Sequence, residues 1–144
     1  MLKGIHPAIS PELLASLSEM GHGDEILFAD AHFPAHTLNK KVIRADGVKI
    51  DTLLAGVMPL FELDQFVDIP VIMMAPVSGD VPDLDVEKRY LSVINAYSEC
   101  IDNAEKIERF AFYDRAALCS VIVLTGEAVK YGNIILKKGV IEGE

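Results

Sequence analysis

Short apolar runs alternate with amphipathic segments along the chain, which predicts strands interleaved with helices. Alternation of this kind favours an α/β fold, and fully apolar strands favour a sheet covered on both faces. We therefore expect a three-layer α/β/α single domain over residues 1–144, with a central mixed sheet. The expected strands are 26–29, 69–77, 106–110, 119–126 and 133–139, and the expected helices are 10–21, 51–64, 85–97 and 111–118.

Individual residues predict where these elements begin and end. Ser10 is a good helix N-cap, and Gly21 can adopt the left-handed conformation that stops the same helix. Pro34 is expected to end regular structure after the first strand, and the sequence RADG at 44–47 predicts a turn. Pro59 should kink the second helix or divide it in two.

Composition adds information about partners. Hydrophobic residues make up 51% of the chain and the mean hydropathy is +0.30, so part of the apolar surface is expected to lie between subunits of an oligomer. The net charge is −9, from 13 basic and 22 acidic residues, and no basic run is present. We therefore expect neither nucleic acid nor an anionic membrane as a partner.

The two cysteines, Cys100 and Cys119, form no CxxC pair and no zinc spacing. Cys119 opens an apolar run and is expected to be a buried free thiol, which fits a reducing cytoplasm. The first ten residues have no signal-peptide core, and no apolar run has the length of a membrane span. A cytoplasmic location follows as an expectation.

Candidate chemistry concentrates in the stretch EMGHGDEILFADAHFPAH, residues 19–36. His22 lies between two glycines, and histidine can both take and return a proton near neutral pH. Asp30 follows a buried strand, where a carboxylate is costly unless it lines a cleft or has a partner. A surface turn for His22 and an Asx turn for Asp30 are the alternatives. His32 and His36 have an i, i+4 spacing, but Pro34 argues against a helix that would present both to a metal.

Two later segments carry polar groups suited to a neutral, hydroxyl-rich ligand. Arg109 stands beside aromatic residues and offers a planar fork of donors, although a surface salt bridge is an equally ordinary role. The sequence KYGN at 130–133 provides a phenol, a flexible backbone and a side-chain amide in Tyr131, Gly132 and Asn133. A simple turn is the alternative for this segment.

Taken together, several segments resemble the L-fucose mutarotase and D-ribose pyranase family over nearly the whole chain. The similarity to the fucose mutarotase branch is carried by RFAFYDRA and PLFELD. The other matching segments are GHGDEILFADAHFPAH, VIRADG and TGEAVKYGNIILKKGV.

The resemblance implies an isomerase without cofactor or metal that interconverts the anomers of L-fucose, with ribose as a further candidate. It implies that His22 is the acid/base residue and that Asp30, Arg109, Tyr131, Gly132 and Asn133 contact the sugar. It also implies a homo-oligomer, a decameric ring with sites near subunit boundaries. Asp30 is a candidate for orienting His22, and Phe112 or Tyr113 for sheltering a sugar methyl group.

Two alternatives to an acid/base mutarotase remain at the level of sequence. The first is a sugar-binding protein without turnover, which only a measurement of anomer exchange distinguishes. The second is a metal-dependent sugar isomerase that uses His22, His32 and His36.

Overall fold

The computed structural model describes residues 1–143 and is built around one six-stranded sheet, in the order β2-β5-β1-β6-β3-β4. The strands are β1 (Glu25–Ala29), β2 (Val42–Ala45), β3 (Val71–Met74), β4 (Glu105–Ile107), β5 (Val121–Thr125) and β6 (Ile134–Lys137). The helices are α1 (Pro11–Glu19), α2 (Ala35–Leu38), α3 (Ile50–Val57), a 3₁₀ turn (Met58–Leu60), α4 (Leu84–Ile94) and α5 (Arg109–Leu118).

The sheet is mixed because β6 runs against its two neighbours. The strand β1 pairs in parallel with β5, as β5 does with β2 and β3 with β4, whereas β6 is antiparallel to both β1 and β3. The carboxyl ends of β1, β3, β4 and β5 therefore lie at the same edge of the sheet as the amino end of β6. The loop before β1 and the segment after β6 lie at the opposite edge.

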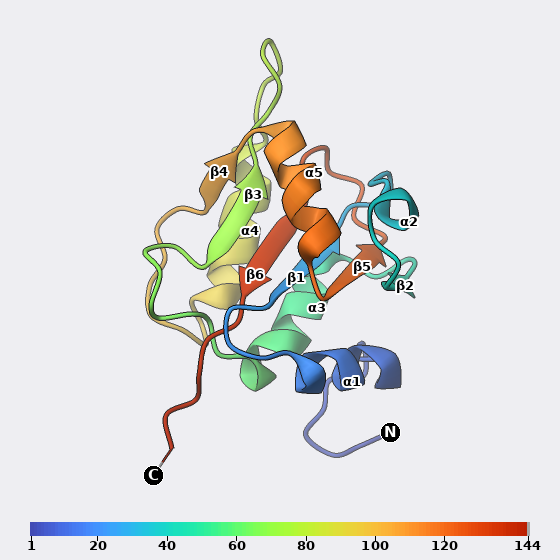
Figure 1. Ribbon diagram of the computed structural model, residues 1–144, viewed down its shortest axis with the longest axis vertical. Helices are drawn as coiled ribbons and strands as arrows, with labels where there is room; N and C mark the ends of the chain where they lie inside the picture. The colour runs from blue at the N-terminus through green and yellow to red at the C-terminus, as the bar shows by residue number, and fades with distance from the viewer. Residues whose placement is uncertain (144) are drawn as a thin grey trace.

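Helices cover both faces of the sheet, which confirms the three-layer arrangement (Figure 1). Side chains alternate along the strands, so Ile26 and Phe28 of β1 face α1, α3 and α4, whereas Leu27 and Ala29 face α2 and α5. Within residues 1–143, no helix is long and apolar enough to cross a membrane.

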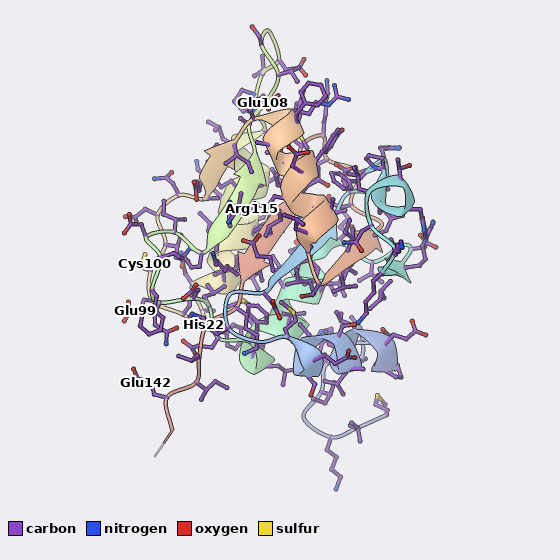
Figure 2. All side chains as sticks on the ribbon, viewed as in Figure 1. His22, Glu99, Cys100, Glu108, Arg115 and Glu142 are labelled. Carbon is purple, nitrogen blue, oxygen red and sulfur yellow. The ribbon has the colours of Figure 1, made fainter. Side chains whose placement is uncertain are left out.

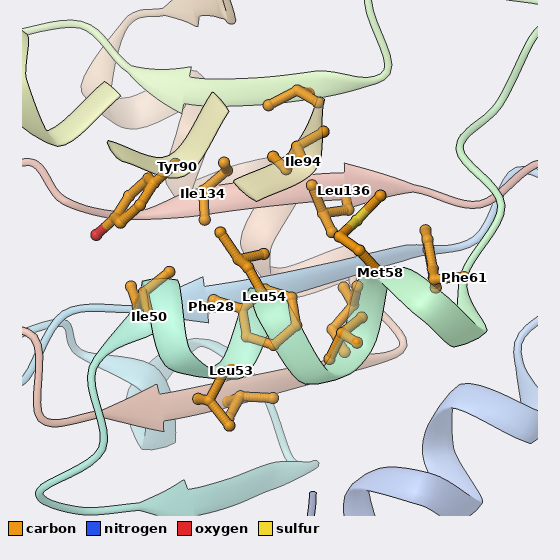
Figure 3. Packing of buried hydrophobic residues seen from close by; sticks show 14 of the residues in the cluster. Phe28, Ile50, Leu53, Leu54, Met58, Phe61, Tyr90, Ile94, Ile134 and Leu136 are labelled. Atoms are coloured by element: carbon orange, nitrogen blue, oxygen red, sulfur yellow. The ribbon is translucent and has the colours of Figure 1, made fainter. Parts of the chain in front are cut away.

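The larger core layer forms around α3, whose apolar face packs against β1 and β6 (Figure 3). Leu53 and Leu54 are fully buried there. Tyr90 of α4 lies in the same layer, and its hydroxyl group donates a hydrogen bond to the Gly132 carbonyl oxygen at 2.8 Å. This core residue thereby supports the segment that precedes β6.

Most expected elements are present, with shorter strands than the apolar runs indicated. Ser10 caps α1 through its hydroxyl oxygen, Pro59 lies within the 3₁₀ turn that follows α3, and Cys119 is buried. The turn at 44–47 is confirmed by Gly47, which has a φ of 78°.

Two expectations are wrong, and two short elements were missed. The strand expected at 106–110 ends at Ile107, because the Glu108 side chain accepts hydrogen bonds from the next amides and caps α5. Gly21 does not stop α1 in a left-handed conformation; Gly23, with a φ of 87°, takes that conformation instead. The short elements β2 and α2 were not expected, since four residues are too few for a periodic signal.

Substitution of Leu54 by Ala is expected to lower the free energy of unfolding by about 2–5 kcal/mol, because it opens a cavity between α3 and the sheet. Urea denaturation measures the loss. The matched control is Leu54→Met, which nearly conserves volume and should cost less than about 1.5 kcal/mol. Equal losses from the two substitutions would contradict close packing at this position.

Candidate functional site

A hollow of about 380 Å³ opens at the edge of the sheet where β1, β3 and β4 end and β6 begins. Its polar lining includes Asp30, His32, Arg109, Tyr131 and Asn133, which come from three separate parts of the sequence. These residues come together because β6 runs antiparallel to β1. Asn133, just before β6, therefore lies at the same edge of the sheet as Asp30, just after β1. Phe33, Met74, Val77 and Tyr113 supply an apolar wall.

A hydrogen bond between the backbone of Asp30 and the side chain of Asn133 joins two residues that line this hollow. The Asp30 amide donates to Asn133 Oδ1 at 2.7 Å, and the Asp30 carboxylate accepts from the His32 amide at 2.9 Å. Asp30 is only 8% exposed, and burial raises the pKa of its carboxyl group against the opposing effect of these hydrogen bonds. The result is a fixed, partly desolvated acceptor.

The segment from Tyr131 to Asn133 is tightly constrained. Tyr131 has a φ of 62°, an uncommon conformation for a residue other than glycine. At Gly132, a Cβ atom would lie 2.8 Å from the Val129 carbonyl oxygen, so a side chain does not fit without movement of the backbone. This close approach lets the chain turn directly from Tyr131 into the buried Asn133.

The loop between β3 and α4 reaches over the hollow and is tied to Tyr131. The Tyr131 hydroxyl group donates to the Asp80 carboxylate and accepts from the Val77 amide at 3.3 Å. Lys130 Nζ lies 2.8 Å from Asp80 Oδ2, and these contacts, the lysine first, lower the pKa of Asp80. Figure 1 shows this loop projecting beyond the start of α5.

Arg109 is the first residue of α5, where a positive charge opposes the helix dipole. Helix stability therefore does not account for it. Its Nε donates to the Tyr113 hydroxyl group at 3.2 Å, and the guanidinium lies 5.3 Å from the centre of the Tyr113 ring. Within residues 1–143 Arg109 forms no ion pair, so its fork of donors is directed to the hollow rather than to a carboxylate.

The two carboxylates and the two cationic side chains around the hollow balance one another when all four are charged and His32 is neutral. Asp30 and Asp80 carry two negative charges, and Arg109 and Lys130 carry two positive ones. Both acceptors and donors line a space suited to a small molecule, beside an apolar wall. This combination fits an uncharged ligand with several hydroxyl groups and one apolar group.

His22 lies at the opposite end of β1. The five residues of β1, at about 3.3 Å each, separate the two ends by roughly 16 Å. In Figure 2, His22 is at the lower left, whereas Glu108, the neighbour of Arg109, is at the top. Within one chain the histidine and the hollow are therefore not parts of a single pocket.

The partner of His22 is Asp64, not Asp30. His22 Nε2 lies 3.2 Å from Asp64 Oδ1, and the imidazole ring packs against Phe66 with ring centres 5.3 Å apart. Asp64 is buried, whereas Phe66 is 70% exposed. A larger hollow of about 530 Å³ borders Asp64, but none of the site residues expected from the sequence lines it.

The expected site residues thus divide into two groups. Asp30, Arg109, Tyr131 and Asn133 meet in one hollow with the Gly132 backbone between the last two, and His22 stands apart. His32 lines the hollow, whereas His36 interacts with Arg44 at 3.3 Å. Phe112 is fully buried in the core, so of the two aromatic candidates expected to shelter a methyl group only Tyr113 belongs to the wall.

Asp64 is the functional candidate that the sequence analysis missed. It ends the segment PLFELD, but a separation of 42 residues from His22 gave no sign that the two side chains meet.

Comparison with known proteins agrees with this architecture. The chain is 62% identical over 140 residues to an L-fucose mutarotase of Glaesserella parasuis serovar 5, covering 97% of this chain and 96% of the relative. It is 59% identical to an L-fucose mutarotase of Haemophilus influenzae, with 97% of both chains covered.

Among solved structures, the fucose mutarotase of Streptococcus pneumoniae in complex with L-fucose superposes with a TM-score of 0.91 at 43% identity, covering 98% of this chain and 100% of that one. The model of the RbsD / FucU transport protein family matches residues 3–141. The chain belongs to the RbsD / FucU family.

Proposed function

We propose that this chain is an L-fucose mutarotase that interconverts the α and β anomers of L-fucose by acid/base ring opening and closing. The observation that carries the proposal is the 62% identity, over almost the entire chain, to a protein of that activity. The chemistry of the hollow supports it, because balanced charges together with both donors and acceptors suit a neutral sugar.

The binding roles follow from the contacts within the hollow. The Asp30 carboxylate would accept hydrogen bonds from sugar hydroxyl groups, and the Arg109 fork would donate to others. Tyr131 and Asn133, with the Gly132 backbone, would fix the orientation of the ring. The apolar wall of Phe33, Met74, Val77 and Tyr113 offers a place for the methyl group of a 6-deoxy sugar.

The acid/base role falls to His22, although it lies away from the hollow of its own chain. A complete site then requires the hollow of one copy to receive the His22 of another. The 70% exposure of Phe66 beside His22 supports an interface there, since a large exposed aromatic side chain gains stability by burial. The decameric ring expected from the family resemblance would provide such boundaries.

A cofactor-free mechanism is sufficient for this reaction, because the ring bond opens and closes with proton transfers alone and without oxidation, reduction or group transfer. The competing metal isomerase would need His22, His32 and His36 together, and within residues 1–143 these side chains do not converge. A sugar-binding protein without turnover remains the second candidate, because it would use the same hollow. The cytoplasmic location that we also propose is supported by two cysteines that are free thiols.

Replacement of His22 by Gln should reduce catalysed anomer exchange by about 10²–10⁴-fold, the usual contribution of a positioned acid/base group. Saturation-transfer NMR between the α and β signals of L-fucose measures the exchange. A panel with ribose and galactose defines selectivity. If the wild-type protein shifts the sugar signals without accelerating exchange, it is a binder and not an enzyme.

A mixture of subunits tests whether two copies share a site. His22→Gln and Asp30→Asn proteins, each nearly inactive alone, should regain about one quarter of the wild-type activity when they are unfolded and refolded together in equal amounts. One site in four would then combine an intact His22 with an intact Asp30. No recovery, with the oligomer reassembled, would show that each chain works alone.

Replacement of Asn133 by Ala should weaken fucose binding at least about tenfold, because the Asp30 amide loses its acceptor and the carboxylate loses its fixed position. The matched control is Asn39→Ala, which removes hydrogen bonds to Ala116 and Cys119 away from the hollow. The control should lower stability but leave the dissociation constant, measured by calorimetry, unchanged.

A further inference from the structure

We propose that Asp64 is a positioning residue that fixes the tautomer of His22 and leaves Nδ1 as the nitrogen that exchanges a proton with the sugar. The catalytic part of this inference rests on the proposed function, whereas the tautomer of His22 can be measured without any activity. It follows from the contacts of two side chains that lie 42 residues apart in the sequence.

Asp64 is built into the fold as a fixed acceptor. Its Oδ1 accepts from the Phe66 amide at 3.0 Å, and its own amide donates to the Lys137 carbonyl oxygen at 2.9 Å, which ties the residue to β6. The hydrogen bond from Phe66 is the main cause that lowers the pKa of Asp64, and His22 and Lys137 act in the same direction. The carboxylate is therefore ionised at neutral pH and has no proton to donate.

An ionised carboxylate at 3.2 Å from Nε2 requires that nitrogen to carry the proton. In the neutral ring, the lone pair then lies on Nδ1. The His22 side chain is 45% exposed while that of Asp64 is 3% exposed, so a half-exposed ring is anchored through Nε2 to a buried carboxylate. Phe66 packs against the ring with an interplanar angle of 52° and limits its rotation.

The other charged groups near the turn have different partners. Asp24 accepts from the Gly21 amide at 2.8 Å, and Lys138 Nζ donates to the Gly139 carbonyl oxygen at 3.3 Å. Lys137 interacts with Asp64 rather than with the ring. Within residues 1–143, Asp64 is the carboxylate that bonds His22 directly.

The proton balance of ring opening assigns the role of Nδ1. Nδ1 takes the proton of the anomeric hydroxyl group, and the electrons of that O–H bond form the carbonyl bond of the open aldehyde. The bond between the anomeric carbon and the ring oxygen breaks, its electron pair stays on the ring oxygen, and water supplies the proton that this oxygen needs. After the aldehyde rotates, the steps reverse and give the other anomer. Asp64 keeps its charge throughout and stabilises the transient imidazolium.

Nitrogen-15 NMR of the labelled wild-type protein at alkaline pH gives the first measurement and needs no variant. We expect the Nε2–H tautomer for His22, assigned by the loss of its signals in His22→Gln. Observation of the Nδ1–H tautomer would overturn the proposal.

Asp64→Asn gives the second measurement, because an amide can donate to Nε2 and no longer enforces one tautomer. We expect a mixed or reversed tautomer and a fall in kcat of at least about tenfold with KM changed less than about twofold. The matched control, Asp24→Asn, alters a carboxylate of the same turn that bonds the backbone instead of the ring, and it should retain the wild-type tautomer and kcat. An Asp64→Asn protein with unchanged tautomer and kcat would contradict the proposal, whereas a wild-type protein without exchange activity would contradict the proposed function alone.

Discussion

The hydrogen bond from the Asp30 amide to Asn133 Oδ1 joins the end of β1 to the start of β6, across 103 residues of sequence. Both groups are buried, so loss of this bond would leave a donor without a partner, at a cost of about 1–3 kcal/mol. The bond exists because β6 runs antiparallel to β1, which brings the two strand ends to one edge. The hollow, its carboxylate and the constrained Tyr131 all depend on this reversal of one strand.

The sequence predicted the residues of the hollow better than their arrangement. Apolar runs located the strands, and polar residues at strand ends located Asp30 and the segment at 130–133. Strand order and direction come from contacts between distant segments, which periodicity does not encode. For that reason nothing in the sequence revealed that Asp64 faces His22. The strand predicted at 26–29 already lay between His22 and Asp30, so their separation could be read from the sequence.

Arg109 was expected in a strand but is the first residue of α5. The alternation in KIERF predicted a strand. Instead, the carboxylate of Glu108 caps a helix that begins at Arg109, just before the aromatic residue Phe110. The helix places Arg109 beside Tyr113, one turn further on, and so directs the guanidinium to the hollow. The structure places Arg109 at the hollow, as the prediction requires, although its backbone conformation differs from the expected one.

The equal numbers of positive and negative groups around the hollow contrast with a net charge of −9 for the whole chain. An uncharged sugar therefore approaches without electrostatic steering, and its rate of binding should be nearly independent of ionic strength. A sugar phosphate, in contrast, would have to approach against the net negative charge of the chain. The overall field of the chain thus favours an uncharged monosaccharide over its phosphate.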